Sequence, residues 1–146
     1  MIEIRNLSVS VEGKRILNDV NLHIGRGETI VLFGPNGSGK TSLLKTIMGI
    51  PQYGVESGNI IYKGEEITKR SIDERARLGI GIVFQNPPAV RGVRLKDIMR
   101  ICMGKSGTFT EERINEDAEK LNFTDFLDRD VNLGFSGGEI KRSELL

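Results

Sequence analysis

One run of residues carries the clearest chemistry in this sequence: Gly34-Pro35-Asn36-Gly37-Ser38-Gly39-Lys40-Thr41. Its fixed positions match the phosphate-binding pattern G-x-x-x-x-G-K-[ST]. The glycines reach backbone conformations that are closed to other residues, so the chain can wrap closely around phosphate oxygens. Lys40 supplies a positive charge for the β- and γ-phosphates, and the Thr41 hydroxyl can ligate Mg²⁺. The run therefore predicts a site for a nucleotide polyphosphate.

The flanking residues predict the elements that must position this loop. Residues 28–33 form a short apolar run, which is typical of a buried parallel strand. Residues 42–48 space their apolar side chains at helical intervals, and Gly49 marks the end of the helix. A helix that starts at the loop offers unpaired N–H groups and the positive end of its dipole to an anion. A glycine-rich turn that binds nothing is the alternative, and the strand and helix around the loop argue against it.

A second run, Gly134-Phe135-Ser136-Gly137-Gly138-Glu139, again places small residues with free N–H groups before a predicted helix, residues 140–146. By itself S-G-G-E is also consistent with an ordinary helix cap. Gln85 ends another apolar run, residues 80–84, which we expect to be a strand. The chain thus contains two predicted anion-facing helix starts and a glutamine at the end of a strand.

The first 24 residues predict antiparallel strands. Apolar and polar residues alternate over 2–4, 7–11 and 18–24, with a turn at 12–14. Alternation favours a sheet with one face in water, so we expect His23, opposite in phase to its apolar neighbours, to face solvent. His23 is the sole histidine, and we assign it no catalytic role.

The later elements are mostly helical. A capping box at Ser71 predicts a short helix. Two more helices are expected at 95–103 and about 110–121, the second capped by Thr108. Two consecutive prolines and a change of character just before these helices predict a boundary. We therefore expect an α/β nucleotide-binding core at 1–87 and a helical subdomain at 88–146.

The composition excludes several classes of function. Twenty-one basic residues against 20 acidic ones give a net charge of +1. This near-neutral balance does not indicate binding to nucleic acid or to an anionic membrane. Neither a membrane-spanning run nor a signal peptide is recognisable, so we expect a cytoplasmic protein. The single cysteine, Cys102, rules out an internal disulfide and a Cys-ligated metal site in this chain. Its helical spacing with apolar residues predicts a buried thiol.

The motifs occur in one order: a phosphate loop, a strand ending in glutamine, then S-G-G-E. Over residues 1–146 this combination resembles the ATP-binding cassette (ABC) ATPases, in which S-G-G-x-[QE] is the signature motif and the glutamine marks the Q-loop. The resemblance implies a P-loop NTPase core with N-terminal antiparallel strands and a helical subdomain. It also implies a head-to-tail dimer that sandwiches ATP between the phosphate loop of one chain and the signature motif of the other.

Carried onto this chain, the resemblance assigns a role to each motif residue. Lys40 and Gln85 form the catalytic set, in which Lys40 neutralises phosphate charge and Gln85 lies near the attacking water. Thr41 and Gln85 reach Mg²⁺, and the signature residues meet the γ-phosphate in trans. The residues expected to bind ATP are Gly34, Pro35, Asn36, Gly37, Ser38, Gly39, Lys40, Thr41, Ser42, Ser136, Gly137, Gly138 and Glu139.

Within the family, the details resemble the SufC-type ATPases of iron–sulfur cluster assembly. Residues 131–142 are closer to that group than to transporter signatures, where leucine usually stands in place of Phe135. This resemblance implies SufB/SufD-like scaffold subunits as partners, with Arg91, Gly92 and Val93 as candidate contacts. An ATPase subunit of an ABC membrane transporter and a nucleotide-binding fragment without turnover remain as alternatives.

One family element is not found in these 146 residues. In the family, a strand of four apolar residues followed by Asp-Glu supplies the Mg²⁺-linked aspartate and the hydrolytic base, and a switch histidine follows. No aspartate of this sequence follows four apolar residues. The resemblance therefore implies that the C-terminal part of the core sheet is missing here, and we expect the native chain to continue past Leu146.

Overall fold

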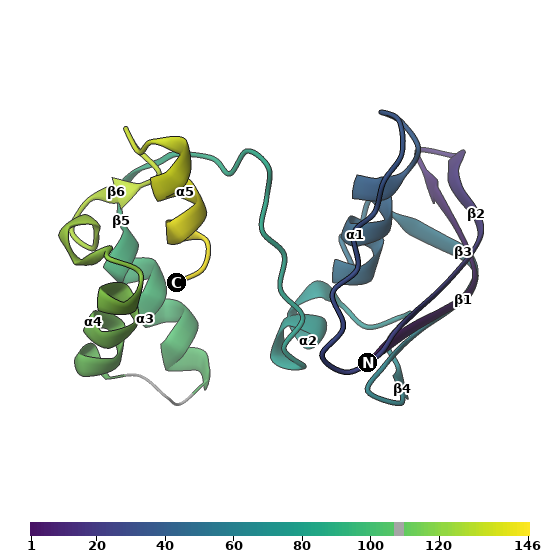
Figure 1. Ribbon diagram of the computed structural model, residues 1–146, viewed down its shortest axis with the longest axis horizontal. Helices are drawn as coiled ribbons and strands as arrows, with labels where there is room; N and C mark the ends of the chain where they lie inside the picture. Colours follow the sequence, from purple (N-terminus) through teal and green to yellow (C-terminus); the bar gives the residue numbers. More distant parts are fainter. Residues whose placement is uncertain (107–109) are drawn as a thin grey trace. The chain divides into compact units, whose positions relative to one another are not determined.

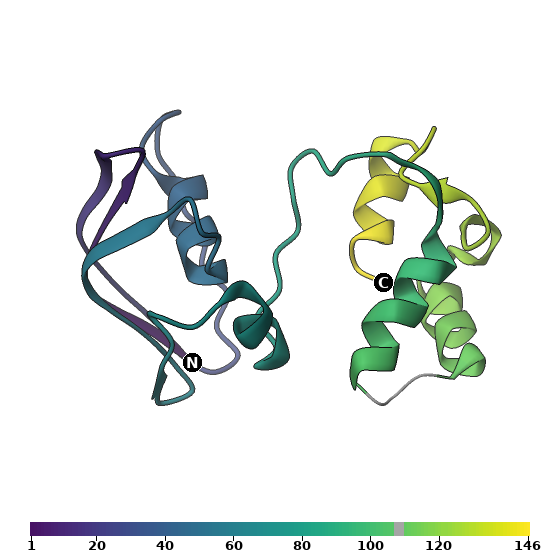
Figure 2. The ribbon, with the colours of Figure 1, turned by 180° about the vertical axis from the view of Figure 1, so that it is seen from behind.

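The computed structural model describes residues 1–106 and 110–146 of the chain. The chain divides into two compact units, Met1–Ile82 and Val83–Leu146, and each is described by itself. The first unit is a sheet with two helices, and the second is mainly helical (Figures 1 and 2).

The first unit is built on a four-stranded antiparallel sheet with the strand order β2-β1-β3-β4. Its strands are β1 (Ile2–Val11), β2 (Lys14–Ile24), β3 (Gly54–Tyr62) and β4 (Glu65–Glu66). Helix α1 (Lys40–Met48) lies beside this sheet (Figure 1). The antiparallel pairing expected for the N-terminal residues is confirmed.

The β1–β2 hairpin closes through a two-residue turn. Glu12 and Gly13 both have positive φ, 50° and 78°, as a type I′ hairpin turn requires. The separate strands expected at 2–4 and 7–11 are one strand, because its pairing shifts around Asn6 without ending. There the side-chain amide of Asn6 donates through Nδ2 to Asp19 Oδ1 at 2.8 Å across the hairpin. Side-chain hydrogen bonds thus stabilise an irregularity within one strand, which the alternation of the sequence suggested to be a gap between two strands.

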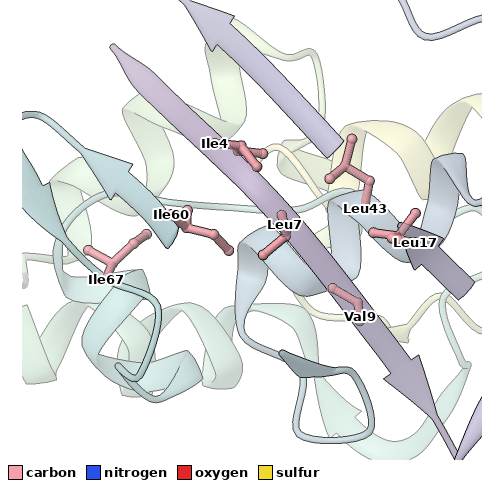
Figure 3. Close-up of a cluster of buried hydrophobic side chains, with 7 residues drawn as sticks. All are labelled: Ile4, Leu7, Val9, Leu17, Leu43, Ile60 and Ile67. Atoms are coloured by element: carbon pink, nitrogen blue, oxygen red, sulfur yellow. The ribbon is translucent and has the colours of Figure 1, made fainter. Parts of the chain in front are cut away.

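The core of this unit lies where α1 meets the sheet. Leu7, Val9 and Ile60 are fully buried on the strands, and Leu43 reaches them from the helix (Figure 3). His23 is exposed, as expected for the wet face of the sheet. The buried cluster consists of Ile4, Leu7, Val9, Leu17, Leu43, Ile60 and Ile67.

Two expected strands do not form. Residues 28–33 and 80–84 lie outside every strand of the described chain. Val31 is 64% exposed and Phe33 is 89% exposed, so the run before the phosphate loop is not buried either. A parallel strand needs a hydrogen-bonding neighbour along its edge, and the described strands pair only with antiparallel partners. The apolar runs predict burial but do not supply the neighbouring strand.

The second unit packs helices around an aromatic cluster. Helices α3 and α4 lie side by side (Figures 1 and 2), and a short antiparallel ladder joins β5 to β6. The buried side chains of this unit include Leu95, Ile114, Phe123 and Phe135. Its elements are β5 (Val90–Arg94), α3 (Leu95–Ser106), α4 (Glu111–Lys120), the 3-10 helix η1 (Thr124–Phe126), β6 (Asp130–Val131) and α5 (Gly137–Ser143).

Two expectations for this unit need correction or stay open. The hydroxyl of Thr110 caps α4 by accepting from Arg113 N at 3.2 Å, whereas the expected cap, Thr108, lies outside the described residues. Cys102 is exposed and not buried, because the face of α3 that packs on the core is formed by Leu95, Met99 and the partly buried Met103. Helical spacing predicted that one face of α3 packs on the core, but in the turn that contains Cys102 the packed residue is Met103.

A buried arginine ties the two helices of the first unit together. Helix α2 (Ile72–Arg77) begins at Ser71 in the expected capping box. Its Arg75 is 2% exposed, and Nη1 donates to the carbonyls of Thr46 and Ile47 at 2.7 and 2.8 Å. These carbonyls lie at the end of α1, which leaves its last C=O groups without partners within the helix. Arg75 therefore caps α1 with a charge that suits the negative end of its dipole.

The rest of the guanidinium is satisfied within the same unit. Nη2 donates to Thr68 O at 2.8 Å, and Nε donates to Arg70 O at 3.0 Å. Burial lowers the pKa of Arg75 from its usual value, and the described residues place no carboxylate within ion-pair distance of it. Backbone carbonyls therefore take the place of a counter-ion.

We expect Arg75→Met to destabilise the chain by about 1–3 kcal/mol, because buried carbonyls lose their donors. Urea unfolding followed by circular dichroism measures the change. The matched control is Arg77→Met on the same helix, where the side chain is 77% exposed and pairs with Asp73 at 3.1 Å. Its free energy of unfolding should change by no more than about 0.5 kcal/mol. Equal midpoints for the two variants would contradict the capping role.

Candidate functional site

The phosphate loop leads into α1 through three glycines with positive φ. Gly34, Gly37 and Gly39 all have positive φ, at 152°, 83° and 90°. Gly39 is also the N-cap of α1, and a Cβ added there would lie 2.7 Å from Leu17 Cδ2 on β2. Both the backbone conformation and the close approach of β2 therefore require glycine at this position.

Lys40 folds back along the loop. Its ammonium donates to Gly34 O and Pro35 O at 2.8 Å each and lies 3.4 Å from Ser38 Oγ. A lysine ammonium has three N–H donors, and these three contacts are all with the loop. The positive charge therefore stands at the residues that the motif assigns to phosphate.

The start of α1 suits an anion. Within the described residues, no side chain caps Gly39 and no acidic residue occurs in the first turn. The first backbone N–H groups of a helix have no acceptor within it, and they carry the positive end of the dipole. Thr41 is exposed in this turn and Ser42 is partly buried. The Thr41 hydroxyl is thus available as a Mg²⁺ ligand beside a bound phosphate, which fits the oxygen chemistry that Mg²⁺ prefers.

A groove of about 360 Å³ adjoins the loop. Leu17 and Val20 line it from β2, and Leu32 and Phe33 line it from the segment before the loop. Lys40 and the glycines form its polar end. The groove therefore joins an apolar wall to a cationic end, as a ligand with an apolar ring and a charged tail requires.

The second candidate segment begins α5 with a capping box. Ser136 N donates to Glu139 Oε2 at 2.6 Å, and Glu139 N donates to Ser136 Oγ at 3.4 Å. The hydrogen bonds from Ser136 lower the pKa of Glu139, and the charges of Arg129 and Arg142 lower it further. Glu139 therefore stays ionised and holds Ser136 in place at the start of the helix.

Gly137 and Gly138 have no steric reason within the described chain to be glycine. A Cβ added at either position would meet no heavy atom within 4 Å. Glycine in a helix weakens it by roughly 0.5–1 kcal/mol relative to alanine, so the pair carries a cost. Both residues are exposed. The two glycines therefore leave room for another molecule to approach the backbone closely.

Gln85 lies exposed in a bend, and the residues on either side of it are tied to the C-terminal part of the chain. Phe84 N donates to Glu144 Oε1 at 2.8 Å, and Lys141 donates to Phe84 O. On the other side, Asn132 Nδ2 donates to Pro88 O at 3.1 Å. The Gln85 segment is therefore bracketed by contacts to α5 and to the turn before it.

The predicted site residues thus fall into two groups. Residues 34–42 belong to the first unit, whereas Gln85 and residues 136–139 belong to the second. Sequence reasoning missed Asn132, which has φ 57° and also accepts from Ser143 Oγ at 2.7 Å. An asparagine two residues before a glycine is a common signal of a left-handed turn, but its partners come from distant positions in the chain.

Comparison with known proteins identifies the family. Residues 17–146 match the family model described as ABC transporter. The chain therefore belongs to the ABC transporter family.

Individual relatives share this match along the whole chain. The probable ATP-dependent transporter slr0075 of Synechocystis is 42% identical over 158 residues, covering 100% of this chain and 61% of the relative. The probable ATP-dependent transporter ycf16 of Trieres chinensis is 38% identical over 161 residues, covering 100% of this chain and 62% of the relative. A probable ABC transporter ATP-binding protein of Streptococcus pyogenes is 38% identical, with 60% of its length covered. The chain thus spans less than two thirds of the length of these relatives.

Solved structures confirm the fold. The ATP-binding cassette MJ1267 of an ABC transporter superposes with a TM-score of 0.80 at 22% identity, covering 99% of this chain and 62% of that one. Another ATP-binding subunit of an ABC transporter gives the same TM-score at 22% identity, and this chain covers 60% of it. The expected α/β ATPase fold with antiparallel N-terminal strands is therefore confirmed. None of the helices in the described residues is long and apolar enough to cross a membrane.

We expect Gly39→Ala to cost more stability than Gly37→Ala. Both variants place a side chain at positive φ, a strain of roughly 1–2 kcal/mol per residue. The Cβ at Gly39 also meets Leu17 at 2.7 Å, whereas at Gly37 it meets nothing within 4 Å. Urea unfolding of both variants measures the difference. Leu17→Ala removes a core side chain and is destabilising by itself, but Gly39→Ala should cost less in the Leu17→Ala background than in the wild type. Equal destabilisation by the two glycine variants would show that contact with β2 is unimportant.

Proposed function

We propose that this chain is the ATP-binding and hydrolysing part of an ABC-type ATPase that closes around ATP as a head-to-tail dimer. The phosphate loop geometry carries the proposal. Three glycines at positive φ, a folded-back Lys40 and an uncapped helix start occur together in residues 34–41. This combination suits a polyphosphate, because the backbone N–H groups and the ammonium are both donors to an anion.

The roles in binding follow from these residues. Lys40 exchanges its carbonyl contacts for phosphate oxygens when ATP binds, and the backbone N–H groups of residues 34–41 surround the phosphates. Thr41 would ligate Mg²⁺ beside the phosphates, where the ion would neutralise charge that develops on the phosphate oxygens. The family resemblance assigns Gln85 to the same ion. The apolar wall formed by Leu17, Val20 and Leu32 receives the base. Ser42 completes the first turn of α1.

The signature motif acts in trans in this proposal. Gly137 and Gly138 are exposed and have no neighbour that forbids a side chain, so the close approach that they permit comes from a second chain and its nucleotide. The Ser136 hydroxyl accepts from Glu139 N and keeps its own proton for a phosphate oxygen. Glu139 fixes the cap, because its carboxylate accepts from Ser136 N.

Hydrolysis follows from the same contacts. Water attacks the γ-phosphorus, the bond to the bridging oxygen breaks, and ADP and phosphate leave. The family resemblance assigns the orientation of that water to Gln85. The Asp-Glu pair that supplies the base in the family does not occur in these 146 residues, so the residues present bind and orient the reactants. Loss of the γ-phosphate removes the charge that joins the two surfaces, and the dimer opens.

For the biological role, we propose SufC-type function in iron–sulfur cluster assembly, with SufB/SufD-like scaffold subunits as partners. The support is Phe135, which stands where transporter signatures usually carry leucine and which packs edge-on against Phe123 and Phe126, at 5.7 and 5.2 Å between ring centroids. The expected cytoplasmic location stays a prediction.

The second candidate is the ATPase subunit of a membrane transporter. The printed names of relatives favour it, because they are called probable ATP-dependent transporters and a probable ABC transporter ATP-binding protein. The two candidates share the motor and differ in the partner. Purification of the native complex separates them: a scaffold without membrane segments supports the first candidate, and an integral membrane subunit supports the second.

We expect Lys40→Ala to weaken ATP binding by at least about 100-fold, a loss of about 3 kcal/mol. The physical reason is the removal of a cation from the phosphates. Fluorescence titration with a labelled ATP analogue measures the affinity. The matched control is Lys45→Ala on the same helix, where the ammonium lies 5.7 Å from the centroid of the Tyr53 ring and away from the loop. Unchanged affinity in Lys40→Ala would overturn the assignment of the phosphate loop.

We expect Arg91→Glu to weaken partner binding by about tenfold while ATP affinity stays the same, since a rim charge contributes roughly 1 kcal/mol. Arg91 is exposed on β5, whereas Arg94 is held by Asp97 at 2.9 Å, so Arg91 is the cleaner probe. Co-purification with the native partner measures the effect, with Arg113→Glu on α4 as the control. Parallel loss of ATP affinity would count against a partner-specific role.

A further inference from the structure

The signature motif follows directly on an aromatic cluster. Phe123 and Phe126 stack at 4.4 Å between ring centroids, with their planes 8° apart. Phe135 meets both of them edge-on. Because Phe135 immediately precedes Ser136, the position of its ring determines where the α5 cap begins.

Arg129 covers this cluster from the solvent side. Its guanidinium carbon lies 4.9 Å from the centroid of the Phe126 ring and 4.9 Å from that of Phe135. A guanidinium over an aromatic face is attracted by the electron-rich ring. One side chain therefore joins η1 to the residue before the signature motif.

The same arginine closes the turn between them. Arg129 Nη2 lies 3.5 Å from Leu133 O, and the turn contains two left-handed residues, Asn132 at φ 57° and Gly134 at φ 68°. The backbone of Arg129 is itself fixed, because its carbonyl accepts from Leu95 N at 3.0 Å. The guanidinium thus reaches the turn from an anchored position at the start of α3.

Among the described residues, no carboxylate lies within 4.0 Å of Arg129, whereas Arg94, Arg100 and Arg113 each have one at that distance. The charge of Arg129 is instead close enough to lower the pKa of Glu139 in the capping box. The side chain is therefore directed at the rings and at the start of α5.

We propose that Arg129 is a positioning residue for the signature motif: by stacking on Phe126 and Phe135 and closing the turn at Leu133, it sets the position of Ser136 and its two following glycines. This inference rests on the proposed trans contact of that motif with ATP. Arg129 acts through Phe135 and does not touch the nucleotide. Its loss changes how well the motif meets a partner's ATP and leaves the phosphate loop intact.

Three variants of the full-length protein test this. Arg129→Met keeps an apolar chain over the rings but removes the charge and the donors, and Arg129→Lys keeps the charge. Arg113→Met on α4 is the matched control, since Arg113 faces solvent and pairs with Asp117 at 3.7 Å. For each variant we measure ATP affinity, the constant for ATP-driven dimerisation, and amide hydrogen exchange by NMR.

We expect Arg129→Met to weaken ATP-driven dimerisation by about tenfold, since two ring contacts are lost at each of two signature motifs. Arg129→Lys should recover dimerisation to within about threefold of the wild type, because an ammonium retains the cation–ring attraction. Exchange of the Glu139 amide, which donates to Ser136 Oγ, should quicken in Arg129→Met. Exchange of the buried Ile114 and Ala118 amides in α4 should not change, and ATP affinity should match that of the control.

Other outcomes overturn the proposal. Dimerisation equal to that of Arg113→Met would show that Arg129 does not position the motif. Equal acceleration at Glu139, Ile114 and Ala118 would show a general loss of stability. If the wild type does not dimerise with ATP, the proposed trans contact fails, and the exchange of the Glu139 amide still decides whether Arg129 holds the turn.

Discussion

Both candidate segments depend on the backbone N–H groups at the start of a helix, which have no acceptor within the helix. At α1 these donors stay available, because Gly39 adopts a left-handed conformation and has no side chain that could accept from them. At α5 one of them is taken, since the Ser136 hydroxyl accepts from Glu139 N. The two helix starts therefore differ in character: the first offers several donors to a highly charged group, and the second offers a fixed hydroxyl and exposed glycines.

Local features of the fold could be predicted from the sequence with good accuracy. The turn at Glu12 and Gly13, the capping box at Ser71 and the left-handed loop before Lys40 each depend on a few adjacent residues with specific backbone or side-chain chemistry. Such features need no distant partner, so residue type and spacing determine them. The phosphate loop belongs to this class, and for that reason a candidate site was recognisable from eight residues.

Features that depend on distant residues could not be predicted. The runs at 28–33 and 80–84 are apolar enough for strands, but strand formation requires a neighbour that periodicity does not identify. Cys102 lies on the predicted helical face, yet its neighbour Met103 is the residue that packs on the core there. The clamp of Asn132 on Pro88 and Ser143 joins segments 44 and 11 positions away, and no local pattern encodes such a contact. The identification of the family came from the order of motifs, which adds information that physical patterning alone lacks.

The guanidinium of Arg75 has a consequence for how ligand binding reaches the rest of the first unit. It holds the last carbonyls of the same helix whose first residues form the phosphate loop. A ligand that binds only the folded helix raises the free energy of unfolding by mass action. The added stability extends to the carbonyls that Arg75 binds, so α2 unfolds together with α1 although α2 does not contact the phosphates. Nucleotide occupancy is thereby thermodynamically linked to the order of a segment at the opposite end of α1.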